Sequence, residues 1–225
     1  MRRIQVVLLI ALACFGASAR LFAQTADDVS RVEISGGVRW IGSLDLASVL
    51  ANETTLGGGQ RALFDSTTTL DRSFGGTVTV GVRLSQLIRV EGSAVYSPTQ
   101  LITRVTDDTE GAPDTAITAP VTQILVEGGV VATPPPWRTR HVSPFVTAGI
   151  GYLRQLNDGR TLVETGGSYY VGGGLYYVRT STRPGRVKAT GLRADVRALG
   201  LHHGVAPDSD WRAAPAITAT FFMRF

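Results

Sequence analysis

The amino-acid sequence predicts an all-β protein, namely an eight-stranded antiparallel transmembrane β-barrel. Three observations lead to this fold class. The chain begins with the features of a secretory signal peptide, continues as a series of alternating apolar and polar segments, and ends on an aromatic residue, Phe225. No later segment reaches the roughly 20 apolar residues that a membrane-spanning helix needs. A chain that is exported and has only short alternating segments is therefore expected to cross a membrane with strands.

The first 19 residues are predicted to be the signal peptide. Met1-Arg2-Arg3 is a short positive region, Val6 to Phe15 is an uninterrupted apolar run, and Ala17-Ser18-Ala19 supplies small residues for cleavage. Cleavage after Ala23 is the alternative. Residues 20–225 then form one barrel domain. Loss of Arg2 and Arg3 leaves 20 basic against 18 acidic residues, so the net charge falls from +4 to +2 and gives no reason to expect nucleic-acid binding.

Cys14 is the only cysteine, and it lies inside the predicted signal peptide. Lipidation at Leu12-Ala13-Cys14 would require a leucine three residues before the cysteine, and the sequence lacks it. The mature chain is therefore expected to contain no thiol. This excludes disulfides, thiolate catalysis and cysteine-ligated metals from the expected chemistry.

Eight segments alternate between apolar and polar residues, as strands with one lipid-facing side must. In the first of them, Val32, Ile34, Val38 and Trp40 alternate with Glu33, Ser35 and Arg39. The predicted strands are 32–40, 77–84, 88–96, 122–132, 144–153, 169–179, 190–201 and 213–225. The predicted connections alternate between long (42–73, 97–120, 154–168 and 202–212) and short (85–87, 133–143 and 180–189). Long outer loops and short periplasmic turns are the usual asymmetry of outer-membrane barrels, whereas a soluble β-sandwich has no reason to alternate in this way.

Charged residues in these strands fall on the face opposite the apolar set. An arginine at the lipid midplane costs about 2–4 kcal/mol, so this face is expected to point into the barrel. Five arginines and four carboxylates would meet there: Glu33, Arg39, Arg83, Arg89, Glu91, Glu127, Arg193, Asp195 and Arg197. Because an eight-stranded barrel is filled by its own side chains, we interpret the set as an ionic plug. A gated polar channel is the alternative.

Aromatic residues are predicted to mark the two membrane interfaces. Trp40, Tyr96, Tyr152 and Trp211 fall at the outer ends of their strands, and Tyr177, Trp137 and Phe225 fall at or near the periplasmic ends. In the closing strand every second residue is apolar, and the chain stops on the last of them. We interpret Ile217, Phe221, Met223 and Phe225, together with Ala219, as both the lipid face and the signal read by the barrel assembly machinery.

The second half of the chain resembles a known family, the small outer-membrane proteins related to the membrane domain of outer membrane protein A. The resemblance rests on residues 144–152, 171–178 and 191–197 and on the terminal Phe225. It implies the barrel fold and a place in the bacterial outer membrane, reached after secretion across the inner membrane. It implies no shared chemistry. A peptidoglycan-binding domain after the barrel, which larger members carry, is not expected.

Catalysis, cofactors and metals are not predicted. His202, His203, Asp208, Ser209 and Asp210 cluster near the last outer connection, but their spacing matches no acyl-transfer or zinc motif. The sequence therefore favours a non-enzymatic outer-membrane protein with a structural or surface-interaction role. A narrow channel for small polar or hydrophobic molecules is the alternative, and a lipid-modifying enzyme is a weaker one. Expected partners are outer-membrane lipid, lipopolysaccharide and the assembly machinery, and the chain is expected to be a monomer.

Overall fold

The structure is a computed structural model that describes residues 31–54, 60–106, 113–137, 139, 141–157, 162–180, 186–203 and 211–225. The predicted signal peptide and both predicted cleavage sites lie outside these residues. Among the described residues, no helix is long and apolar enough to cross a membrane.

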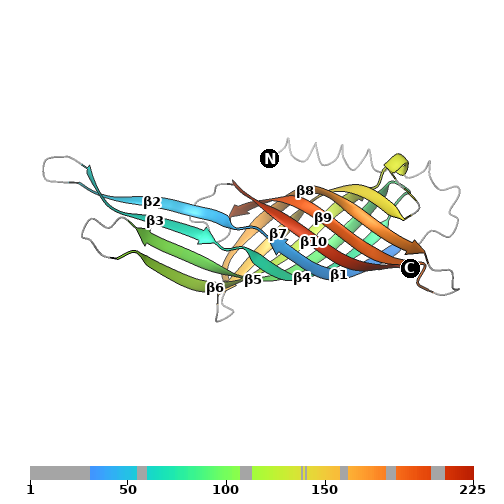
Figure 1. Ribbon diagram of the computed structural model, residues 1–225, viewed down its shortest axis with the longest axis horizontal. Coiled ribbons are helices and arrows are strands. Elements are labelled where there is room, and N and C mark those ends of the chain that lie inside the picture. Colours follow the sequence, from blue (N-terminus) through green and yellow to red (C-terminus); the bar gives the residue numbers. More distant parts are fainter. Residues whose placement is uncertain are drawn as a thin grey trace, which may run out of the picture.

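Eight strands form a closed antiparallel barrel (Figure 1). They are β1 (Val32–Ile41), β4 (Ser73–Arg83), β5 (Ile88–Thr106), β6 (Thr115–Ala132), β7 (Val142–Asn157), β8 (Leu162–Thr180), β9 (Ala189–His203) and β10 (Trp211–Arg224). The order around the ring is β5-β4-β1-β10-β9-β8-β7-β6, and β6 returns to pair with β5. The eight-stranded barrel predicted from the sequence is thereby confirmed.

Two further strands correct the sequence prediction. The segment 42–73, predicted to be a long outer connection, contains β2 (Leu44–Thr54) and β3 (Gln60–Leu70), which pair antiparallel with each other. The alternation of β2 is obscured by a register shift between Asp45 and Ala47, because an extra residue in one strand breaks the period of two. The serine- and threonine-rich β3 gave no apolar pattern, although threonine is a good strand residue.

The same correction applies to the connection predicted at 97–120. β5 and β6 run far beyond the barrel and pair from Ile88↔Ala132 up to Val105↔Thr115. β3 joins the upper part of β5 from Leu70↔Leu101 to Asp65↔Thr106. Strands β2, β3 and the upper parts of β5 and β6 therefore form a four-stranded sheet, here called the extension, which projects from one end of the barrel (Figure 1).

The opposite end of the barrel carries short connections and the carboxyl terminus (Figure 1). Leu84 and Ser85 both donate backbone hydrogen bonds to the carbonyl oxygen of Ile88, which closes a tight turn between β4 and β5. Between β6 and β7 lies the 3-10 helix η1 (Pro135–Trp137). Following the usual asymmetry of these barrels, we assign this end to the periplasm and the extension to the outside.

Side chains on the barrel wall alternate between the lipid and the interior. In β4 and β10 every second residue is buried, and the residues between them are exposed. Ile217, Phe221, Met223 and Phe225 all face outward, between 37% and 49% exposed. Tyr96, Tyr152, Tyr169 and Trp211 also face outward near the outer end, and Tyr177 does so near the periplasmic end. The side chain of Trp137 lies outside the described part of the structure.

The barrel interior is layered along its axis. Near the outer end, Leu44, Leu46, Leu70, Leu153 and Leu201 belong to one apolar cluster. Near the periplasmic end, Val131, Phe145, Tyr176 and Phe222 form a second, largely aromatic cluster. Charged residues lie beside the second cluster and beyond it, because Arg89 pairs across the strands with Val131 and Arg224 follows Phe222 on β10.

The assigned orientation predicts which positions are reachable from outside the cell. Cysteine introduced at Ser48, which is exposed in β2, should react on intact cells with a membrane-impermeant maleimide. Cysteine at Gln86, in the turn between β4 and β5, should react only after the outer membrane is permeabilised. Labelling of the Gln86 position on intact cells would show that the assigned orientation is wrong.

Candidate functional site

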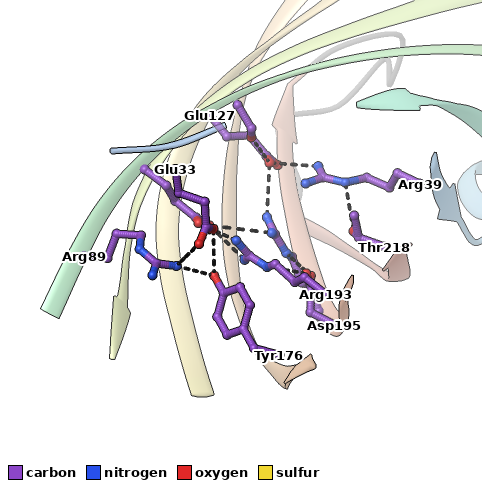
Figure 2. Close-up of polar contacts among 11 residues, drawn as sticks. Glu33, Arg39, Arg89, Glu127, Tyr176, Arg193, Asp195 and Thr218 are labelled. Atoms are coloured by element: carbon purple, nitrogen blue, oxygen red, sulfur yellow. Dashed lines mark hydrogen bonds and ion pairs between the residues drawn. The ribbon is translucent and has the colours of Figure 1, made fainter. Parts of the chain in front are cut away.

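The barrel interior contains a cluster of arginines and carboxylates contributed by five strands, β1, β5, β6, β9 and β10. We call it the ionic core, and it consists of Glu33, Arg39, Arg89, Glu91, Glu127, Arg193, Asp195, Arg197 and Arg224. Figure 2 shows most of these side chains pointing toward one another from strands that are distant in the sequence. The first eight are buried, and Arg224 is nearly so.

The periplasmic part of the ionic core is centred on Glu33. This carboxylate accepts hydrogen bonds from Arg89 at 3.0 Å and from Arg224 at 2.7 Å. The hydroxyl of Tyr176 accepts a hydrogen bond from Arg89 at 2.7 Å and lies 3.4 Å from a Glu33 oxygen (Figure 2). Glu33 is in the first strand and Arg224 is in the last, so this group connects the two strands that close the ring.

The middle of the ionic core holds two arginines between two carboxylates. Arg193 binds Glu91 through both terminal nitrogens, at 2.5 Å and 3.0 Å, which is the bidentate geometry that fits a carboxylate best. Asp195 accepts hydrogen bonds from Arg193 at 3.1 Å and from Arg197 at 2.6 Å. Alternate residues of β9 point inward, so the spacing of 193, 195 and 197 places all three side chains together.

The outer part of the ionic core is centred on Glu127. One of its oxygens accepts hydrogen bonds from Arg39 at 2.8 Å, Ser93 at 3.2 Å and Arg197 at 3.4 Å. Its second oxygen is buried and has no hydrogen-bond partner in the described part of the chain. Gly151 lies opposite Glu127, where a Cβ atom would come within 2.9 Å of Glu127 Cγ. Glycine at this position therefore makes room for the carboxylate side chain.

Aromatic rings pack against the arginines. The Arg193 guanidinium lies 4.7 Å from the ring centre of Phe145 and 5.4 Å from that of Tyr176. Arg197 lies 4.5 Å from the ring centre of Tyr170, and Arg224 lies 4.6 Å from that of Phe222. Stacking on aromatic faces suits the planar, weakly hydrated guanidinium and adds to the ion pairs when water is excluded.

Eight of the nine interior residues predicted from the sequence lie in the ionic core. The ninth, Arg83, is half-buried near the periplasmic end of β4. The sequence analysis did not include Arg224, Tyr170, Tyr176, Phe145 or Phe222. Their inward positions follow the same alternation that identified the charged set, and extending it to Arg224 and to the aromatic residues would have found them.

The ionic core leaves little room for a solute. In the described structure, a cavity lies on the outer side of the ionic core and is lined by Leu44, Leu70, Leu153, Gln155 and Arg212, among others. Its volume is only about 10 Å³, which is at the lower limit for a single water molecule. Arg212 donates hydrogen bonds to the backbone oxygens of Asp45 and Leu46, which ties β10 to β2 beyond the point where β1 ends. At this level the barrel interior is filled by side chains.

Of the histidine cluster considered in the sequence, the structure describes the two histidines, whose ring centres lie 4.0 Å apart. His202 faces outward beside Trp211, with ring centres 4.9 Å apart, and His203 turns to the inner cavity. Asp208, Ser209 and Asp210 lie outside the described residues. No group of three or more metal-ligating side chains occurs among the residues that the structure describes.

Comparisons with known proteins agree with this architecture. The sequence model of the outer membrane protein beta-barrel domain matches residues 7–210. The chain is similar in structure to OprG of Pseudomonas aeruginosa, with a TM-score of 0.53 and 13% identity over 88% of this chain and 96% of that one. It is also similar to Neisserial surface protein A, with a TM-score of 0.50 and 13% identity over 86% and 97% of the two chains. At this identity the two structures show the fold alone, and comparison with curated proteins finds no match. Because the family model covers most of the sequence, the chain belongs to the outer membrane protein beta-barrel domain family.

Proposed function

We propose that this protein is a non-enzymatic surface-interaction protein of the outer membrane, in which a closed barrel anchors a recognition sheet outside the cell. The observation that carries this proposal is the extension, a four-stranded sheet that continues the barrel wall beyond the membrane. The ionic core is its structural plug. Lipopolysaccharide surrounds the barrel, and the assembly machinery inserts it as a monomer.

The extension offers an open edge for a partner. Within the described residues, β2 pairs along its length with β3 alone, and its other edge faces away from the sheet. Such edges are templates for a further strand, and proteins protect them with proline, charged side chains or bulges. In β2 the charges and register shifts lie toward its two ends, and residues 47–51 between the shifts contain no charge and no proline, whereas the other edge of the extension carries Pro120. The β2 edge therefore suits an extended polypeptide that adds a strand.

A narrow channel for small apolar molecules is the second candidate. It is favoured by the apolar residues that continue from the outer lumen onto the extension, where Leu101 and Ile117 share a face with Leu70. The ionic core opposes it, because an apolar molecule that travelled along the axis would have to displace paired charges. The ionic core also argues against a channel for small polar molecules, because its paired side chains occupy the interior.

Removal of the β2–β3 hairpin separates these functions. A variant in which residues 44–70 are replaced by Gly-Gly should keep the barrel, because β1 and β4 already pair at Ile41↔Ser73. We expect proteoliposomes with the intact protein to bind immobilised reduced, carboxymethylated α-lactalbumin, a permanently unfolded polypeptide, and this variant to lose that binding. Binding should also slow hydrogen exchange of the β2 amides.

Planar-bilayer recordings test whether the protein is a channel. The intact protein should show no steady ion conductance, and neutralisation of Arg193 or Glu127 should introduce one by opening the ionic core. A steady conductance in the intact protein, together with unchanged polypeptide binding in the hairpin variant, would favour the channel over the surface-interaction role.

A further inference from the structure

A shallow groove of about 690 Å³ lies on the lipid-facing wall formed by β6 to β10. Its floor includes the small residues Ala148, Ala198 and Gly200, and its sides include Ile150, Tyr169 and Val171. Val171 is 62% exposed and pairs with Ala148 on one side and Ala198 on the other, while Tyr169 pairs with Gly200. Val171 and Tyr169 therefore form one wall of the groove over Ala198 and Gly200. The outward lining is almost entirely apolar, which restricts the occupant to hydrocarbon.

The groove lies in the outer half of the membrane. On β8, Val171 is two residues from Tyr169, which belongs to the outer aromatic band, and six residues from Tyr177 in the periplasmic band. Tyr169 packs on Trp211 with ring centres 5.0 Å apart, and this pair forms the outer edge of the groove. Lipid that enters the groove therefore comes from the outer leaflet, which in this membrane is lipopolysaccharide.

A basic side chain stands above the groove. Arg154 faces outward on β7, two residues beyond Tyr152 and about 13 Å along the strand from Ile150. Among the described outward positions of β7, β8 and β9, the charged residues are Arg154 at the outer end and Arg179 at the periplasmic end. Glu164 at the outer end of β8 is also exposed, but it pairs with the inward-facing Gln155 and so lies on the other side of the wall. The outer wall therefore complements an anionic headgroup placed above an apolar chain.

A second copy of the barrel fits this surface poorly. Two barrels in one membrane would meet through the same patch, related by a two-fold axis along the membrane normal. The groove would then face a second groove and leave a void between small residues, which forfeits packing contacts. Arg154 would also approach its own symmetry mate. An acyl chain avoids both costs.

From these observations we propose that the groove holds one acyl chain of a lipopolysaccharide molecule, with a phosphate of its headgroup against Arg154. Without a hydrophobic driving force inside the bilayer, the chain is retained by close packing against Ala198 and Gly200, beside Val171 and Tyr169. The surface thus selects an ordered outer-leaflet lipid. This inference goes beyond the proposed surface-interaction function and does not depend on it.

The test measures binding of hexa-acylated lipopolysaccharide without O-antigen to the full-length protein in detergent, by native mass spectrometry. Ala198→Leu fills the groove and should weaken binding about fivefold. Ala194→Leu is the matched control, because Ala194 faces lipid four residues away on β9 and does not line the groove. Arg154→Gln should weaken binding about fivefold, whereas Arg179→Gln should not. With a dephosphorylated probe, the effect of Arg154→Gln should disappear.

Three results would overturn the proposal. The first is equal binding by the Ala198→Leu and Ala194→Leu variants. The second is binding of phosphatidylglycerol as tight as that of lipopolysaccharide and equally sensitive to Ala198→Leu, because the groove would then take any anionic lipid. The third is a dimer of the intact protein that Ala198→Leu dissociates, because the occupant would then be a second barrel.

Discussion

Replacement of Glu127 by glutamine is expected to lower the free energy of unfolding by about 3–5 kcal/mol. Glu127 is the carboxylate bound by Arg39, whose side chain is 1% exposed, and it also lies 3.4 Å from Arg197. The variant leaves the Arg39 charge buried without its counterion, while Arg197 keeps Asp195 at 2.6 Å. The loss should appear as a lower temperature of the heat-induced gel-mobility shift in detergent.

Two variants make this expectation specific to the buried charge. Val80→Leu changes a lipid-facing residue of β4 that is 48% exposed, and it should leave the transition almost unchanged. The double variant Arg39→Leu, Glu127→Leu removes both charges and should recover part of the loss. Replacing both partners of a buried ion pair with apolar residues costs less than removing one partner, which leaves the other charge buried and unpaired. If Glu127→Gln and Val80→Leu unfold at the same temperature, the ionic core is not a structural plug.

The alternation of apolar and polar residues was enough to predict the barrel. Each barrel strand has one lipid face and one interior face, so the period of two is strong and the sides are unambiguous. The extension could not be predicted in this way. Outside the membrane a polar outer face and an irregular strand carry no large penalty, so β2 can contain the register shift between Asp45 and Ala47.

The same pattern showed which side chains point inward but not which of them meet. Tyr176 and Glu33 are 143 residues apart, and Arg224 and Glu33 are 191 residues apart. Their contacts depend on how the strands are staggered around the ring, which side-chain alternation within each strand does not specify. The sequence therefore did not indicate that Arg224 is a partner of Glu33.

The register between the first and last strands is tightly set. β1 and β10 pair from Glu33↔Arg224 to Ile41↔Ala216. At Gly37 a Cβ atom would lie 2.7 Å from the Cα atom of Thr220, so only glycine permits this approach of the two backbones. A slip by one residue would turn Phe221 and Met223 inward and place Arg224 in lipid, at a cost of up to about 2–4 kcal/mol for the arginine alone.

Substitution of the terminal aromatic residue is expected to have the largest effect on the amount of protein in the outer membrane. Phe225 is 38% exposed on the lipid side, and its amide donates a hydrogen bond to the carbonyl oxygen of Val32 at 2.9 Å. If the closing strand is the assembly signal, Phe225→Asp should leave unfolded chain in the periplasm, because the apolar face of the strand then ends in a charge. Phe225→Trp keeps an aromatic end and should insert normally. Cell fractionation and heat-modifiable gel migration distinguish the two variants. Normal levels of folded Phe225→Asp protein in the outer membrane would show that the ionic core and the strand register direct assembly without the terminal residue.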